Sequence, residues 1–171
     1  DHRMEGSSAK IFKEYTDISG KILINGQPIG PNTIVYLETK DKLKAPKQKT
    51  QSITISQKNL QFSPPNSAVQ VGSTLTFVNN DREVHNIYSK SLKNQFNLGA
   101  MASGASRSIL VKDPGPIVLR CNMHKDMVGT VFVAPNGYFT TTNEKSEYLM
   151  QKVKSKEYIM QVWNPRLYPR E

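Results

Sequence analysis

The sequence contains a single cysteine, Cys121, among its 171 residues. One cysteine excludes an intramolecular disulfide framework, and it excludes zinc or iron–sulfur sites that need several cysteines from one chain. No apolar run approaches the roughly 18 residues needed to cross a bilayer, so an integral membrane protein is excluded. The first eight residues lack the apolar stretch of a signal peptide, which leaves a mature form, a truncated form and a cytosolic protein open.

Positive charge is what the sequence has in excess. Lys and Arg number 23 against 14 Asp and Glu, which gives a net charge of +9. Five lysines between Lys40 and Lys49 contribute much of it and predict a solvated loop or linker. No aromatic RNA-binding motif or helix-turn-helix pattern accompanies the charge, so nucleic acid is not an expected partner.

Short stretches rich in β-branched residues predict many strands and little helix. Asn25-Gly26 is a hairpin-turn dipeptide, and residues 1–17 are polar and expected to be flexible. Residues 144–153 are compatible with a short helix, although strands fit this region better. The predicted strands are Ile22–Ile24, Thr33–Leu37, Ser52–Ile55, Val69–Val71, Thr74–Val78, Val84–Tyr88, Ser106–Val111, Ile117–Leu119, Val128–Val133, Tyr138–Thr142, Glu147–Met150 and Tyr158–Trp163. Strands at this spacing indicate an all-β sandwich or barrel.

Four side chains form a candidate metal site. Cys121, His124 and Met127 follow a predicted strand at intervals of three residues, and His85 follows a turn 36 residues upstream. One thiolate, two imidazoles and a weak thioether are the ligand set of a blue-copper electron-transfer site. Each residue alone is more often a core or surface residue, but their coincidence favours one copper ion per chain. Met123 is a second sulfur candidate, and Met127 is preferred.

Residues 50–134 resemble the cupredoxin family. The resemblance rests on Phe62-Ser63-Pro64, on the Val69–Asp81 stretch with its turn at Gly72, on His85-Asn86, and on the spacing Cys-x-x-His-x-x-Met. It implies a Greek-key β-sandwich with a type 1 copper site and a one-electron carrier rather than an enzyme. It also implies that Asn86 ties the His85 strand to the Cys121 loop.

The two flanks resemble a carboxypeptidase-regulatory-like or transthyretin-like β-sandwich. Residues 18–45 and 136–168 are predicted to pair as a second, split module around the copper domain, as in methylamine-utilisation-like proteins. Ser146 stands where that family has glycine. The alternative is that the flanks add strands to one enlarged sandwich.

Two other functions use the same donors. A copper chaperone or storage protein would bind Cu(I) transferably, and a small copper enzyme acting on a nitrogen oxide or diatomic would need an open coordination position. For the carrier, the positive charge predicts an acidic redox partner, a cytochrome or an oxidoreductase, steered by Lys125, Lys90 and Lys93 toward the His124 edge. The resemblance implies a periplasmic or secreted location. The oligomeric state does not follow from the sequence.

Overall fold

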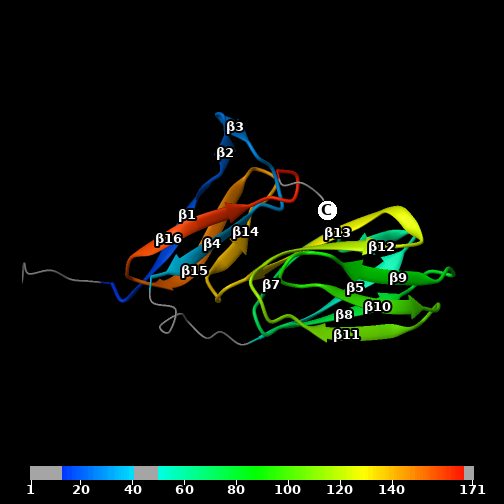
Figure 1. Cartoon of the computed structure of the whole chain (residues 1–171). Coiled ribbons are helices and arrows are strands. Elements are labelled where there is room, and N and C mark those ends of the chain that lie inside the picture. Colours follow the sequence, from blue (N-terminus) through cyan, green and yellow to red (C-terminus); the bar gives the residue numbers. More distant parts are fainter. Residues whose placement is uncertain (1–12, 41–49, 168–171) are drawn as a thin grey trace, which may run out of the picture.

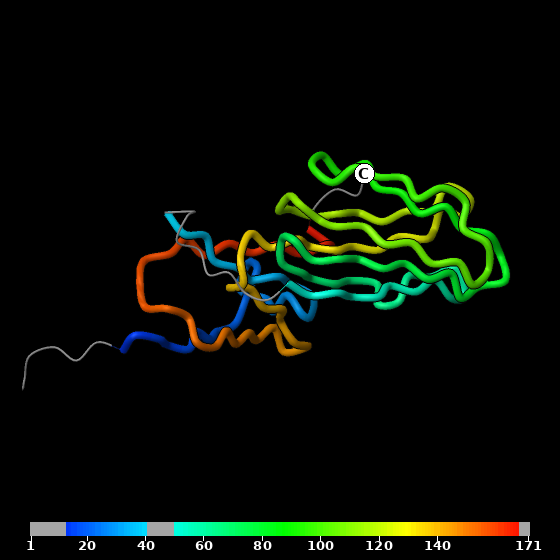
Figure 2. The backbone as a smooth tube through the Cα atoms, turned by 90° about the horizontal axis from the view of Figure 1, so that it is seen from below, coloured from blue at the N-terminus to red at the C-terminus, as the bar shows by residue number. Residues whose placement is uncertain are grey.

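The computed structural model describes residues 13–40 and 50–167, and these residues form β-strands and no helix. The all-β prediction is confirmed. The described part of the chain therefore holds no helix long and apolar enough to cross a membrane. Figures 1 and 2 show two groups of strands side by side, the middle of the chain in one group and both ends of the chain in the other.

The middle of the chain forms a sandwich of two sheets. One sheet has the order β10-β9-β12-β13-β7 and the other the order β11-β8-β5-β6. The strands are β5 (Ser52–Lys58), β6 (Gln61–Ser63), β7 (Asn66–Gln70), β8 (Thr74–Asn79), β9 (His85–Ser89), β10 (Phe96–Met101), β11 (Ser106–Leu110), β12 (Gly115–Cys121) and β13 (His124–Ala134). Pairs β5–β8 and β7–β13 are parallel, and the others are antiparallel.

One hydrophobic core fills the sandwich. In β8, alternate residues point inward, and Leu75 and Phe77 are fully buried between half-buried neighbours. Gly72 makes the β7–β8 turn with a φ of +88°, which favours glycine as the sequence predicts. The buried core residues are Ile55, Phe62, Val69, Leu75, Phe77, Ile87, Met101, Val111, Ile117, Leu119, Cys121, Met127, Val131 and Val133.

Strands from the two ends of the chain pair with each other beside the sandwich. β4 (Ile34–Thr39) lies between β14 (Phe139–Thr141) and β16 (Tyr158–Trp163), and β1 (Tyr15–Lys21) pairs with β15 (Glu147–Lys154). A further hairpin joins β2 (Leu23–Ile24) to β3 (Gln27–Pro28). These strands surround their own small core, in which Leu37, Tyr138, Met150 and Val153 are buried.

Hydrogen bonds also join the strands from the two ends of the chain. The Thr33 N–H donates to Thr142 Oγ1 at 3.0 Å, and the Asn164 amide donates to Thr33 Oγ1 at 2.7 Å. Ser146 adopts a φ of +67°, the conformation that glycine takes most readily, and its hydroxyl accepts the Gly30 N–H at 2.7 Å. The division into two modules stays a prediction, as does the likeness of the flanks to carboxypeptidase-regulatory-like domains.

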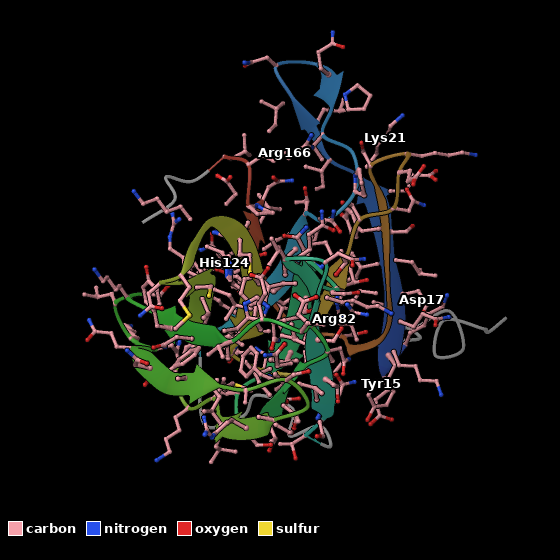
Figure 3. The ribbon with its side chains drawn as sticks, turned by 90° about the vertical axis from the view of Figure 1, so that its right-hand side faces the viewer. Tyr15, Asp17, Lys21, Arg82, His124 and Arg166 are labelled. Atoms are coloured by element: carbon pink, nitrogen blue, oxygen red, sulfur yellow. The ribbon has the colours of Figure 1, made fainter. Side chains whose placement is uncertain are left out.

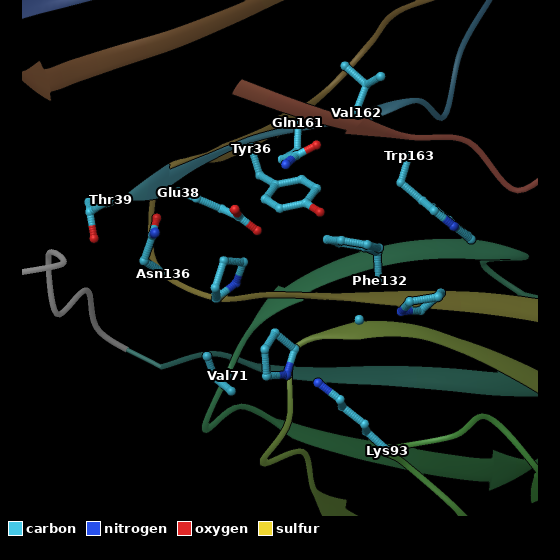
Figure 4. Close-up of a pocket in the computed structure, with 14 residues that line it drawn as sticks. Tyr36, Glu38, Thr39, Val71, Lys93, Phe132, Asn136, Gln161, Val162 and Trp163 are labelled. Carbon is cyan, nitrogen blue, oxygen red and sulfur yellow. The ribbon is translucent and has the colours of Figure 1, made fainter. Parts of the chain in front are cut away.

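An aromatic column connects the flanking strands to the sandwich. Phe132 of β13 lies 4.9 Å from the Tyr36 ring and 5.4 Å from the Trp163 ring, measured between centroids. A cleft of about 720 Å³ opens beside the column (Figure 4), and its other lining residues include Glu38, Lys93 and several prolines. Because Tyr36 and Trp163 belong to β4 and β16, the column is an apolar contact between the two groups of strands.

Replacing Phe132 with alanine should weaken this junction strongly. Phe132 is buried, and removing a buried phenylalanine ring costs about 3–5 kcal/mol. We expect Phe132→Ala to lower the free energy of unfolding by that amount in urea denaturation. Leu149→Ala, which truncates an exposed side chain of β15, is the control and should change it by less than about 0.5 kcal/mol. A Phe132→Ala loss no larger than that of the control would show that the column does not join the two groups.

The structure adds strands to the predicted ones. The Asn25-Gly26 hairpin is present, and its second strand is the short β3, which precedes the predicted strand Thr33–Leu37 and was not predicted. β1 begins at Tyr15, inside the segment predicted to be flexible, and residues 144–153 lie mostly in β15 rather than in a helix. Residues 1–12 and 41–49 lie outside the described residues, and so does residue 168, the last residue of the predicted segment 136–168. Residues 41–49 make up most of the predicted lysine-rich loop.

Candidate metal centre

A tight hairpin positions two of the predicted ligands. Cys121 ends β12 and His124 begins β13, with only the turn Asn122-Met123 between them. The two residues pair across the ladder, where the register shifts after Arg120. The shift turns both side chains toward one point, and the Cys121 Sγ lies 3.6 Å from the His124 Nδ1.

The third predicted ligand comes from the neighbouring strand. His85 is the first residue of β9, which pairs with β12 such that Cys121 lies opposite Ile87. Its side chain is fully buried, and its Nδ1 lies 3.7 Å from the Cys121 Sγ. The ligand atoms of His85, Cys121 and His124 all lie within 4.8 Å of one another. The structure therefore brings these three predicted residues together.

These separations suit donors to a common ion. Sulfur and nitrogen atoms bound at about 2.0–2.3 Å to one metal lie about 3.5–3.8 Å apart when the angle between the bonds is about 109–120°. Both observed sulfur–nitrogen distances, 3.6 and 3.7 Å, fall in this range. Two imidazoles and one thiolate are also the soft donor set that copper prefers in blue-copper sites. The residues present fit a copper ion.

Asn86 connects the strands that carry the ligands. Its backbone N–H donates to the Cys121 Sγ at 3.4 Å. Its side-chain oxygen accepts a hydrogen bond from the Asn122 side-chain amide at 3.2 Å. Its own amide donates to the Asn97 side chain on β10 at 2.7 Å. Asn86 thus links β9, β10 and the β12–β13 turn, in the place where the sequence predicts such a link.

Hydrogen bonds favour the thiolate form of Cys121. Burial is the largest influence and raises the pKa of the thiol. It is outweighed by bonds to the sulfur from the Asn86 N–H, the His124 ring, the Met123 N–H and the His85 ring, which together lower the pKa of Cys121 to about 7. A thiolate is the form that binds a metal, so the site is prepared for one.

Each imidazole has a carboxylate at its second ring nitrogen. The sequence analysis did not single out these two carboxylates. Asp81 Oδ2 lies 2.7 Å from the His85 Nε2, and Glu83 Oε2 lies 2.7 Å from the His124 Nε2. The neighbouring Cys121 sulfur and then Glu83 raise the pKa of His124. The sequence signal for Asp81 was its position four residues before His85. Metal-binding histidines usually donate their second N–H to a carboxylate.

The methionines differ in burial. Met127 is buried in the same core cluster as Cys121, whereas Met123 is half exposed at the tip of the turn. Burial favours Met127 over Met123 as the axial thioether, which stays a prediction. Met101 was not singled out from the sequence, but it is fully buried and pairs with His85 across β9 and β10.

The centre lies at the end of the sandwich away from the flanking strands. His124 begins β13 and Phe132 of the aromatic column is eight residues farther along, roughly 25 Å at the rise of a β-strand. Figure 3 shows His124 and Arg82 on the sandwich, apart from Tyr15 and Lys21 of β1.

Comparisons with known proteins find similar structures and a matching family model. A search of curated proteins finds no match. A purple cupredoxin from Nitrosopumilus maritimus is 26% identical to this chain. The match covers 47% of this chain and 97% of the purple cupredoxin, at a TM-score of 0.42. An oxidised amicyanin mutant is 22% identical. The match covers 48% of this chain and 81% of the amicyanin, at a TM-score of 0.45.

A copper-containing nitrite reductase from Thermus scotoductus SA-01 is 18% identical, and 67% of this chain covers 25% of that longer one at a TM-score of 0.46. The family model described as "Cupredoxin-like domain" matches residues 33–133, which is more than half of the chain. The match includes the sandwich core and His85, Cys121 and His124. The chain belongs to the family of cupredoxin-like domains.

Proposed function

We propose that this protein is a one-electron carrier with a mononuclear type 1 copper site. His85, Cys121 and His124 would hold one copper ion, with Met127 as a weak thioether ligand. The observation that carries the proposal is the triangle of donor atoms, in which both Nδ1 atoms lie 3.6–3.7 Å from one sulfur. Membership of the cupredoxin family supports the same assignment.

The residues around the donors keep their arrangement fixed. A bound copper ion would supply the exchange of one electron between Cu(I) and Cu(II). Cys121 and His124 are held by a two-residue turn, and His85 is immobilised in the core. The Asn86 N–H points at the Cys121 sulfur and restrains it. A carrier works best when its ligands move little on a change of charge, and these contacts restrict that movement.

Cyclic voltammetry of the copper-loaded protein, recorded with its absorption spectrum, tests the proposal. A carrier gives a reversible one-electron couple and an intense thiolate-to-copper band. A copper chaperone or storage protein instead transfers Cu(I) to a competing chelator and shows no reversible couple. A small copper enzyme shows a catalytic current when a nitrogen oxide or another diatomic is added. Either of the last two results would contradict the carrier.

Positive side chains near the centre support an acidic redox partner. Lys90 lies over the Tyr88 ring at 6.0 Å and lines a surface hollow with Arg120, the residue before Cys121. In the sequence, the charges of Arg82 and Glu83 cancel, as do those of Lys125 and Asp126 after His124. We therefore take Lys90 as the charge that attracts a partner, which is a cytochrome or an oxidoreductase in this proposal.

Electron transfer to such a partner should slow as salt is added. Attraction between exposed charges is screened beyond about 8 Å at physiological ionic strength, and steering raises association rates by about 10 to 10³. We expect the second-order rate constant with an acidic cytochrome to fall by about tenfold or more between low and physiological salt, measured by stopped flow. Lys90→Ala should reduce the slope, while Lys152→Ala on β15 should leave it unchanged. A rate that is flat or rises with salt would contradict electrostatic steering.

A periplasmic or secreted location is part of the proposal. Type 1 copper carriers of the cupredoxin family usually work there, and a bound metal would protect the only cysteine from oxidation.

A further inference from the structure

We propose that Glu83 is a positioning residue that holds His124 with its Nδ1 facing the Cys121 sulfur. The inference rests on the proposed function, in which His124 binds the copper ion. Glu83 is not one of the proposed ligands. In this inference its carboxylate sets which ring nitrogen of His124 is protonated and how the ring is oriented.

The His124 ring has a partner at each nitrogen. Its Nε2 lies 2.7 Å from the Glu83 carboxylate, and its Nδ1 lies 3.6 Å from the Cys121 Sγ. A carboxylate accepts hydrogen bonds and cannot donate one, so the Nε2 carries the proton. With copper bound, the Nδ1 would give its lone pair to the ion in place of its bond to the sulfur, as metal-binding imidazoles do.

His124 needs such a partner more than His85 does. The His85 side chain is fully buried and is fixed by packing, whereas the His124 side chain is 21% exposed and follows directly after a turn. The carboxylate beside His85 is also anchored, because Asp81 accepts the N–H groups of Asn59 and Leu60. Removing the Glu83 contact would therefore free His124 more than removing Asp81 would free His85.

One loop presents both carboxylates. It joins β8 to β9 and is organised by the buried side chain of Asn79. The Asn79 amide donates to the carbonyls of Glu83 and Met101, at 2.8 and 2.9 Å, and its oxygen accepts the Asp81 N–H at 2.9 Å. The backbone of Glu83 is thus held from within the core, although 60% of its side chain is exposed. A fixed backbone aims this exposed carboxylate at His124.

The test compares three variants at one alkaline pH, above the raised pKa of His124, so that its imidazole is neutral. Glu83→Ala removes the acceptor, Glu83→Gln keeps an acceptor oxygen but removes the charge, and Asp126→Asn removes a charge two residues from His124. The first readout needs no metal, since ¹H–¹⁵N NMR of the apo protein reports which ring nitrogen of His124 is protonated. The second readout is Cu(I) affinity, measured by competition with a chelator. Circular dichroism checks that each variant is folded.

We expect the wild type, Glu83→Gln and Asp126→Asn to show His124 protonated at Nε2. Glu83→Ala should show a mixture of tautomers and bind Cu(I) about 10- to 100-fold more weakly, the usual loss when the outer partner of a metal-binding histidine is removed. A Glu83→Ala protein with the wild-type tautomer and affinity would overturn the inference. Equal losses in Asp126→Asn would also overturn it, because charge alone would then explain the effect. If the wild type shows no thiolate-to-copper band, the proposed function fails, while the apo NMR comparison still decides the role of Glu83.

Discussion

Replacing Cys121 with serine should abolish the visible thiolate-to-copper band of the Cu(II)-loaded protein and its reversible couple. The band requires a sulfur–copper bond, and Cys121 is the only cysteine of the chain. A hydroxyl at this position would leave two imidazoles without the soft donor that stabilises Cu(I). Absorption spectroscopy and voltammetry on the same samples measure both losses.

The control for this variant is Met123→Leu. Met123 is half exposed at the turn next to His124, so its side chain is near the centre but outside the proposed ligand set. We expect this variant to keep the band. A Cys121→Ser protein that retained the band would contradict the assignment of Cys121 as a ligand, and loss of the band in Met123→Leu would contradict the placement of Met123 outside the centre.

Deleting residues 136–171 should unfold the first segment of the chain and spare the copper site. The deletion removes β14, β15 and β16, so β4 loses both neighbours and β1 loses its partner. The remaining β2–β3 hairpin is only marginally stable alone. All buried residues of the sandwich core lie between Ile55 and Val133, outside the deletion. Limited proteolysis should therefore cut within 13–40 while the thiolate-to-copper band persists.

This deletion distinguishes two arrangements of the chain. A split second module around the copper domain predicts the result above. A single enlarged sandwich predicts that the deletion also destroys copper binding, because the core would be shared. The control is deletion of residues 168–171 alone, which removes none of the described strands and should leave the protease pattern of 13–40 unchanged.

The metal centre could be predicted from the sequence because its donors are few and closely spaced. A thiolate, an imidazole and a thioether at intervals of three leave little freedom once Cys121 and His124 face each other across a turn. His85 lies 36 residues before Cys121, but it is one of only three histidines, and the family resemblance implied its role. The sandwich strands were predictable for a related reason, since strands such as β8 alternate buried and half-buried residues.

The strands that were missed lack that alternation. Nearly every residue of β1 is exposed, and its partner β15 lies more than 100 residues away. In β10 the register shifts between Asn97 and Ala100, where Gly99 has a φ of +74°, so its pattern is interrupted. The carboxylates of Asp81 and Glu83 were missed because their direction depends on the loop that Asn79 organises. The Asn79 side-chain amide sets that loop by donating to the carbonyls of Glu83 and Met101, and no local pattern reveals the bond to Met101, which lies 22 residues away.

The most direct test of a type 1 copper site is a titration of the wild-type apo protein with Cu(II), followed by visible absorption. The proposed ligands predict an intense thiolate-to-copper band that grows linearly and saturates at one equivalent of copper per chain. A folded wild-type protein that takes up Cu(II) without producing this band would contradict the type 1 assignment.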